Sequence, residues 1–154
     1  MTGTVRRGLA MGAIVGVLVS CSSGGSSGGT GPVTATLKEW EIKLSSANVP
    51  AGNVTFNLTN DGDKEHEFIV RKTDLKADSL PLNASGEDAG RINEEAPELT
   101  EVGKPSEVAV VPSGSTGLSL RLTLQPGHYV LFCNLKVEDL LHYQKGMRAD
   151  FTVS

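Results

Sequence analysis

The sequence predicts an all-β domain, a β-sandwich of about seven or eight short strands. Its composition is rich in glycine (18 residues) and poor in aromatic residues (5%), and it shows no long helical period. Short runs of alternating apolar and polar residues recur between turns, which is typical of sandwiches. The 154 residues suffice for one ordinary domain, and neither an internal repeat nor a second domain is visible.

The N-terminus has the pattern of a signal peptide. Arg6 and Arg7 form a basic region, and the apolar run Leu9–Val19 follows. This run is shorter than the roughly 20 apolar residues that span a bilayer. We therefore exclude residues 1–20 from the fold and expect the chain to be exported.

The end of this run, Leu-Val-Ser-Cys21, resembles the lipobox of bacterial lipoproteins. Residues 21–32 are rich in glycine and serine, as in a flexible tether. We expect cleavage before Cys21, lipidation of Cys21, and a folded domain over residues 33–154. An ordinary secretory signal, with Cys21 incidental, is the alternative.

The charge of the domain excludes some partners. Residues 1–20 contain two arginines and no acidic residue, so the remainder carries 12 basic and 18 acidic side chains. An acidic domain without basic clusters argues against nucleic acid and against docking of the domain itself on anionic lipids.

The first half of the domain predicts strands separated by turns. A β-prone run over 33–40 precedes an alternating segment over 41–44, and further strands are expected over 54–59 and 65–72. Side chains alternate between faces along a strand, so His66 shares a face with Phe68 and Val70. His66 therefore points toward a core or its rim, where an inward histidine is either a satisfied core residue or a ligand.

Residues 73–104 form an acidic excursion with eight Asp and Glu against three Lys and Arg. We expect it to cross between the sheets, either irregularly or with a short helix near residues 94–99. Its charge is interpreted as a solvated surface, with an electrostatic docking face as the alternative.

The second half predicts strands over 107–111, 118–124 and 128–134, and a last strand from about Met147. By alternation, Cys133 ends one strand on its apolar side, and Met147 begins the next with the same facing. His142 lies in the loop between these two strands. His128 points to the opposite side of its strand from Cys133, which predicts that it is exposed and is not a ligand.

The unpaired Cys133 is the strongest chemical signal. If lipidation uses Cys21, Cys133 has no partner in an exported protein, where a free thiol is reactive. An intermolecular disulfide or a buried thiol are the alternatives to a metal thiolate. Because His142 and Met147 follow closely, a metal site explains Cys133 better, and sulfur with imidazole suits copper. His66 is the candidate for the second imidazole.

Two segments resemble the cupredoxins, the small blue copper proteins. Asn60–Phe68 is similar to their N-x-G-x-x-x-H-x-F segment, and Pro126–Asn134 with His142–Val153 is similar to their copper loop. The resemblance covers about residues 33–154. It implies an antiparallel Greek-key β-sandwich, one type 1 copper ion and one-electron transfer. By position it implies four ligands: His66, Cys133, His142 and the axial Met147.

The sequence departs from the family in two places. Eight residues separate Cys133 from His142, where the family has about two to five. Glu67 also stands where many members have asparagine. We expect Asn60, Glu67 and Asn134 to hydrogen-bond around the ligands, an arrangement that orients ligands and tunes a metal.

The expected function is that of a membrane-tethered electron carrier, not an enzyme. Three histidines cannot supply the additional sites of a copper oxidase, and one available thiolate cannot build a binuclear centre.

We expect a monomer at the outer face of a bacterial membrane, with redox proteins of the cell envelope as partners. His142 is expected to reach the surface as the electron port. Four apolar residues near it form either an apolar docking patch or the packing of the loop itself: Leu135, Val137, Leu140 and Leu141. A non-redox copper carrier or sensor and a metal-free structural lipoprotein remain alternatives.

Overall fold

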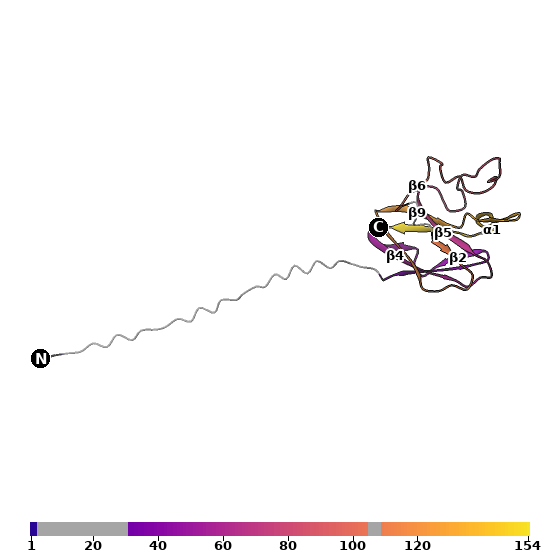
Figure 1. The fold of residues 1–154 in the computed structure, drawn as a ribbon. Coiled ribbons are helices and arrows are strands. Elements are labelled where there is room, and N and C mark those ends of the chain that lie inside the picture. Colours follow the sequence, from indigo (N-terminus) through magenta and orange to yellow (C-terminus); the bar gives the residue numbers. More distant parts are fainter. Residues whose placement is uncertain (3–30, 105–108) are drawn as a thin grey trace.

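The structure, a computed structural model, describes residues 1–2, 31–104 and 109–154 (Figure 1). The predicted lipidation site Cys21 and nearly all of the signal peptide and tether lie outside the described residues. Within the described ranges, no helix combines the length and the apolar character needed to cross a membrane.

Two sheets pack face to face. The first has the strand order β2-β1-β4-β8. Its long members β4 and β8 pair antiparallel over seven residue pairs, from Gly52 with Leu124 to Leu58 with Leu118. The bounds are β1 (Val33–Lys38), β2 (Glu41–Leu44), β4 (Gly52–Asn60) and β8 (Leu118–Leu124).

The second sheet has the order β3-β12-β9-β5-β6, and β7 also pairs with β5. The bounds are β3 (Asn48–Val49), β5 (His66–Lys72), β6 (Thr100–Glu101), β7 (Ala109–Val111), β9 (Gly127–Phe132) and β12 (Arg148–Val153). The predicted β-sandwich is thus confirmed, but the sheets are mixed: β1 runs parallel to β4, and β3 parallel to β12. After β2 the chain crosses to the second sheet, where it forms β3. It then returns to the first sheet as β4, which runs in the same direction as β1.

The main core lies between the sheets and follows the predicted alternation. Inward residues of β4 and β8 are buried except Leu118 at the start of β8, whereas the outward-facing Ser119 and Arg121 are exposed. Phe56 has no exposed surface, and its ring centroid lies 5.2 Å from that of Phe68 and 5.3 Å from that of Phe151. This aromatic group joins both sheets, because Phe56 belongs to the first and the other two rings to the second.

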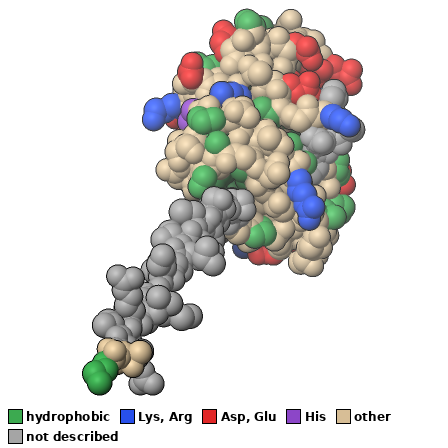
Figure 2. Space-filling model, turned by 90° about the vertical axis from the view of Figure 1, so that its left-hand side faces the viewer, with side chains coloured by type: hydrophobic (Ala, Val, Ile, Leu, Met, Phe, Trp, Pro, Cys, Tyr) green, Lys and Arg blue, Asp and Glu red, His purple; other side chains and the backbone are tan. Residues whose placement is uncertain are grey.

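The excursion over residues 73–104 covers the outer face of the second sheet and encloses a smaller core. Ile69 and Phe132 of the sheet are buried there against Leu80 and Ile92 of the excursion. The excursion joins β5 to β6 in one sheet, so the expected crossing between sheets is wrong. Residues 73–104, all described, contain no helix: their apolar side chains are buried against the sheet by an irregular path. Acidic side chains gather at this end of the molecule (Figure 2), in agreement with a solvated face.

Candidate metal centre

His66, Cys133 and His142 converge at one end of the sandwich and have no exposed surface. One ligand atom from each lies within 4.8 Å of the others. His66 Nδ1 is 3.2 Å from His142 Nδ1, and Cys133 Sγ is 3.4 Å from His142 Nδ1. His142 Nδ1 therefore lies next to both the sulfur and His66 Nδ1, with the Nε2 atoms on the far sides of the rings.

Strand pairing brings the first two residues together. His66 begins β5, and Cys133 directly follows β9, which pairs antiparallel with β5 so that Ile69 lies opposite Phe132. The backbone N–H of Glu67 donates to Cys133 Sγ over 3.2 Å. The alternation that predicted an inward His66 is thus correct, and the sheet register explains why a distant imidazole reaches the cysteine.

The long spacer between Cys133 and His142 is closed by a small hairpin. Strand β10 (Lys136–Val137) pairs antiparallel with β11 (Leu140–Leu141). The His142 N–H then donates to the Leu135 carbonyl over 3.0 Å. Because the additional residues fold back on themselves, the ends of the spacer meet, and the unusual length does not separate the imidazole from the thiol.

Met147 is tied to both neighbouring donors through its backbone. Its N–H donates to the His142 carbonyl over 3.1 Å, and its carbonyl accepts from the Cys133 N–H over 3.1 Å. The single-turn helix α1 (His142–Lys145) ends at Gly146, whose φ of 127° favours glycine. Met147 is fully buried. The structure therefore holds the buried Met147 next to His142 and Cys133 through its backbone, and the role of its thioether as the fourth donor stays a prediction.

The expectation that His142 reaches the surface is wrong. Its ring has no exposed surface, and the half-buried Trp40 packs edge-on against it with centroids 5.0 Å apart. The turn between β1 and β2 supplies Trp40, so a segment distant in sequence covers the ring. Of the predicted apolar patch, Val137 is exposed, whereas the other three residues are half-buried: Leu135, Leu140 and Leu141.

Asn60 stabilises the turn that precedes His66. Its Oδ1 accepts from the Gly62 N–H over 2.9 Å, and its Nδ2 donates to the carbonyls of Lys64 (2.7 Å) and Val111 (2.9 Å). With 1% of its surface exposed, Asn60 fixes the turn from inside the protein.

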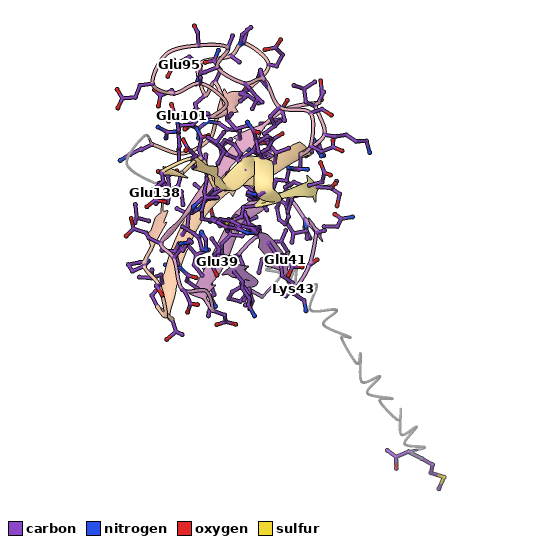
Figure 3. All side chains as sticks on the ribbon, turned by 90° about the vertical axis from the view of Figure 1, so that its right-hand side faces the viewer. Glu39, Glu41, Lys43, Glu95, Glu101 and Glu138 are labelled. Atoms are coloured by element: carbon purple, nitrogen blue, oxygen red, sulfur yellow. The ribbon has the colours of Figure 1, made fainter. Side chains whose placement is uncertain are left out.

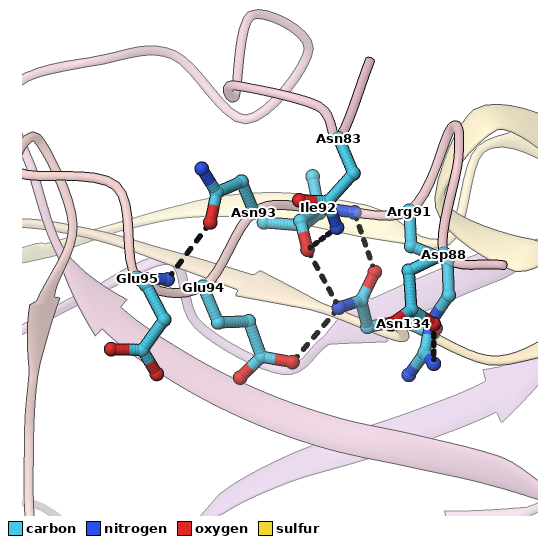
Figure 4. A pocket seen from close by; sticks show the side chains of 8 residues that line it. All are labelled: Asn83, Asp88, Arg91, Ile92, Asn93, Glu94, Glu95 and Asn134. Carbon is cyan, nitrogen blue, oxygen red and sulfur yellow. Dashed lines mark hydrogen bonds and ion pairs between the residues drawn. The ribbon is translucent and has the colours of Figure 1, made fainter. Parts of the chain in front are cut away.

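Asn134 anchors the excursion beside Cys133 (Figure 4). Its Oδ1 accepts from the Ile92 N–H over 2.7 Å, and its Nδ2 donates to the Ile92 carbonyl and to Glu94 Oε1. The Arg91 Nε–H donates to the Asn134 carbonyl over 2.7 Å. These residues line a polar cavity of about 260 Å³. The cavity is thus bounded by the hydrogen-bond network that holds the end of β9.

Glu67 occupies the position where asparagine was expected from the resemblance. Burial raises the pKa of its carboxyl, and the charge of Arg91 and the Asn134 backbone amide partly offset this rise. Its backbone contacts the thiol, as described above. Glu67 and Asn134 directly follow His66 and Cys133 in the chain, whereas Asn60 acts on the turn before His66, and the role of all three around a metal stays a prediction.

His128 lies apart from the cluster, but the prediction that it is exposed is wrong. It is half-buried, with Nδ1 2.8 Å from the Thr73 carbonyl and Nε2 3.0 Å from Asp150 Oδ1.

Sequence reasoning missed Glu39, whose Oε1 lies 3.2 Å from His66 Nε2. No local spacing connects Glu39 with His66, so only the folded chain shows their contact.

Burial keeps the metal-free cluster uncharged. It raises the pKa of the Cys133 thiol to about 11. Burial, together with the neighbouring His66, lowers the pKa of His142 to about 4, and burial also lowers that of His66. Neutral imidazole is the form that binds metals, while the thiol must release a proton on binding.

The metal-free protein is therefore expected to lose stability in acid. His142 has a pKa near 6.5 when unfolded and about 4 when folded, so the unfolded chain binds more protons between these values. The free energy of unfolding should fall as pH drops from 6.5 toward 4, by up to about 1.4 kcal/mol per unit of pKa difference. Urea titrations at pH 7 and pH 4.5 measure this. An His142→Gln variant should show a smaller fall, and an equal fall would contradict this origin.

The fold is the cupredoxin fold, a β-sandwich with a buried His-Cys-His cluster at one end. Auracyanin B is a similar solved structure, with a TM-score of 0.50 and 18% identity over 80% of this chain and 88% of that chain. Reduced auracyanin from Roseiflexus castenholzii has a TM-score of 0.48 and 18% identity, covering 79% of this chain and 94% of its own. Rusticyanin from Thiobacillus ferrooxidans has a TM-score of 0.47 and 14% identity, and the match covers 79% of this chain and 75% of that chain. No protein-family model and no curated protein sequence matches the chain.

Proposed function

We propose that this protein is a type 1 copper protein that carries single electrons between redox partners. The observation that supports this most is the convergence of one thiol and two imidazole Nδ1 atoms in a fully buried cluster. A soft thiolate with imidazoles suits copper, and the combination with a weak axial thioether is that of electron-transfer sites.

In this proposal each donor has a distinct role. His66 and His142 bind through Nδ1, Cys133 binds as the thiolate, and Met147 supplies the weak axial sulfur. A bound copper ion would supply the one-electron Cu(I)/Cu(II) couple. The chain contributes a rigid site, because β5, β9 and the hydrogen bonds of Met147 hold the donors in place.

The burial of the donors favours an electron carrier over a copper carrier. A protein that transfers its ion to a partner must expose the ion or open readily. Here His66, Cys133, His142 and Met147 all have no exposed surface. We therefore interpret copper as a resident cofactor rather than as cargo.

We further propose that the domain is held at the outer face of a bacterial membrane. The basis is the sequence: the apolar run before Cys21, the lipobox-like residues and the Gly/Ser-rich segment over 21–32. A flexible tether would let the domain reach redox proteins of the cell envelope.

Titration of the metal-free protein with Cu(II) tests the proposed function. We expect an intense blue or green colour that saturates at one equivalent, disappears on reduction and returns on oxidation. His128→Ala is the matched control among the histidines and should retain the colour, whereas His142→Ala should alter the spectrum. Copper bound without this colour, or only as Cu(I), would favour a carrier, and absence of binding would refute the metal site.

A further inference from the structure

A carboxylate lies against the outer side of one proposed ligand. Glu39, in the turn between β1 and β2, places Oε1 3.2 Å from His66 Nε2. This nitrogen is on the opposite side of the ring from Nδ1, the atom that faces His142. The carboxylate thus contacts the edge of the imidazole that a metal ion would leave free.

The turn before His66 holds this carboxylate. The Lys64 N–H donates to Glu39 Oε1 over 2.7 Å, and the Asp63 N–H donates to Oε2 over 3.2 Å. A Cβ on Gly62 would lie 2.5 Å from Oε2 and 2.6 Å from Oε1, so the carboxylate fits because residue 62 is glycine. As Asn60 fixes the same turn from inside, Glu39 occupies a preformed cradle.

Glu39 is ionised in this cradle. Burial acts to raise its pKa, but the backbone N–H groups of Glu39, Lys64 and Asp63 and the nearby His66 keep that pKa below its usual value. The two candidate histidines differ in what lies beside Nε2: His66 Nε2 lies 3.2 Å from the Glu39 carboxylate, and no such ion pair is found for His142 among the described residues. Both Nε2 atoms are buried, and among the described residues neither makes a hydrogen bond of full geometry, so the Glu39 carboxylate is the polar group placed to satisfy His66 Nε2.

We propose that Glu39 is a positioning residue that accepts the Nε2–H of His66 and so directs the Nδ1 lone pair toward the metal. This inference rests on the proposed function. A carboxylate bonded to the far nitrogen of a ligating histidine fixes its tautomer and increases its basicity. A more basic imidazole stabilises Cu(II) more than Cu(I), so Glu39 lowers the reduction potential.

The test compares Glu39→Gln and Glu39→Ala with Glu41→Gln in the full chain. Glu41 is exposed on β2, two residues away, so its substitution makes the same charge change without the contact (Figure 3). Loss of such a partner typically weakens metal binding by 10- to 100-fold. If Cu(II) affinity falls tenfold and Cu(I) affinity stays constant, the potential rises by about 59 mV. We expect this rise in both Glu39 variants, larger in the alanine variant, and none in Glu41→Gln.

The ¹⁵N NMR shifts of the His66 ring provide a readout without copper. We expect the Nε2–H tautomer in the metal-free wild type and in the near-isosteric Glu39→Gln, and a mixture of tautomers in Glu39→Ala. An unchanged potential in both Glu39 variants, or an unchanged tautomer in Glu39→Ala, would overturn the inference. A wild type that binds no copper would refute the proposed function and, with it, the effect on potential. A wild type that is blue, with Glu39 variants like Glu41→Gln, would refute the role of Glu39 alone.

Discussion

Replacing Cys133 by serine is expected to abolish the intense colour of the Cu(II) protein. The colour of a type 1 site comes from charge transfer between the thiolate and Cu(II), and a serine oxygen is a harder donor that does not supply it. Cys133 Sγ accepts the Glu67 N–H and lies next to His142 Nδ1, and Cys133 is the only cysteine among the described residues. Optical and electron paramagnetic resonance spectra of the two proteins at one equivalent of Cu(II) measure the difference.

The matched control is the second cysteine of the sequence. Cys21→Ser removes the proposed lipid attachment and leaves the donor set intact, so it should retain the colour of the wild type. Cys133→Ser also buries a hydroxyl in place of a thiol, at a cost of about 1–3 kcal/mol. Folding should therefore be checked by circular dichroism. A folded Cys133→Ser protein that retains the intense absorption would refute the thiolate assignment.

Phe56→Ala is expected to have the largest effect on stability. Phe56 is fully buried and packs against Phe68 and Phe151 across the two sheets. Truncation of a core phenylalanine removes apolar burial and leaves a cavity, which costs about 3–5 kcal/mol. This is a large part of the typical 5–15 kcal/mol that separates folded from unfolded domains. Urea unfolding of the metal-free proteins measures the change.

Ser119→Ala is the control for this substitution. Ser119 lies opposite Asn57, the neighbour of Phe56, but on the exposed face of β8. A surface substitution of this kind usually changes stability by less than about 0.5 kcal/mol. If Phe56→Ala cost no more than Ser119→Ala, the contact between the sheets would not be the main source of stability.

Much of the fold follows from local pattern. Alternation of apolar and polar residues has a period of two only in strands, so β4, β5, β8 and β12 could be located from the sequence, most with small shifts at their ends. The mixed direction of the sheets could not, because it depends on the crossing of the chain through β3. The excursion over residues 73–104 was also misjudged, since its apolar side chains are spaced irregularly and show their common surface only against Ile69 and Phe132.

The sequence by itself identified the candidate donors. Cys133, His142 and Met147 occur in one segment of the chain, and strand alternation shows that the His66 side chain points inward. Both features can be read from residues that are neighbours in sequence. Only the tertiary structure decided what surrounds them. The hairpin that closes the long spacer, the Trp40 ring over His142 and the Glu39 carboxylate against His66 all depend on contacts between distant segments. Such contacts arise from sheet register and turn geometry, which local periodicity does not encode.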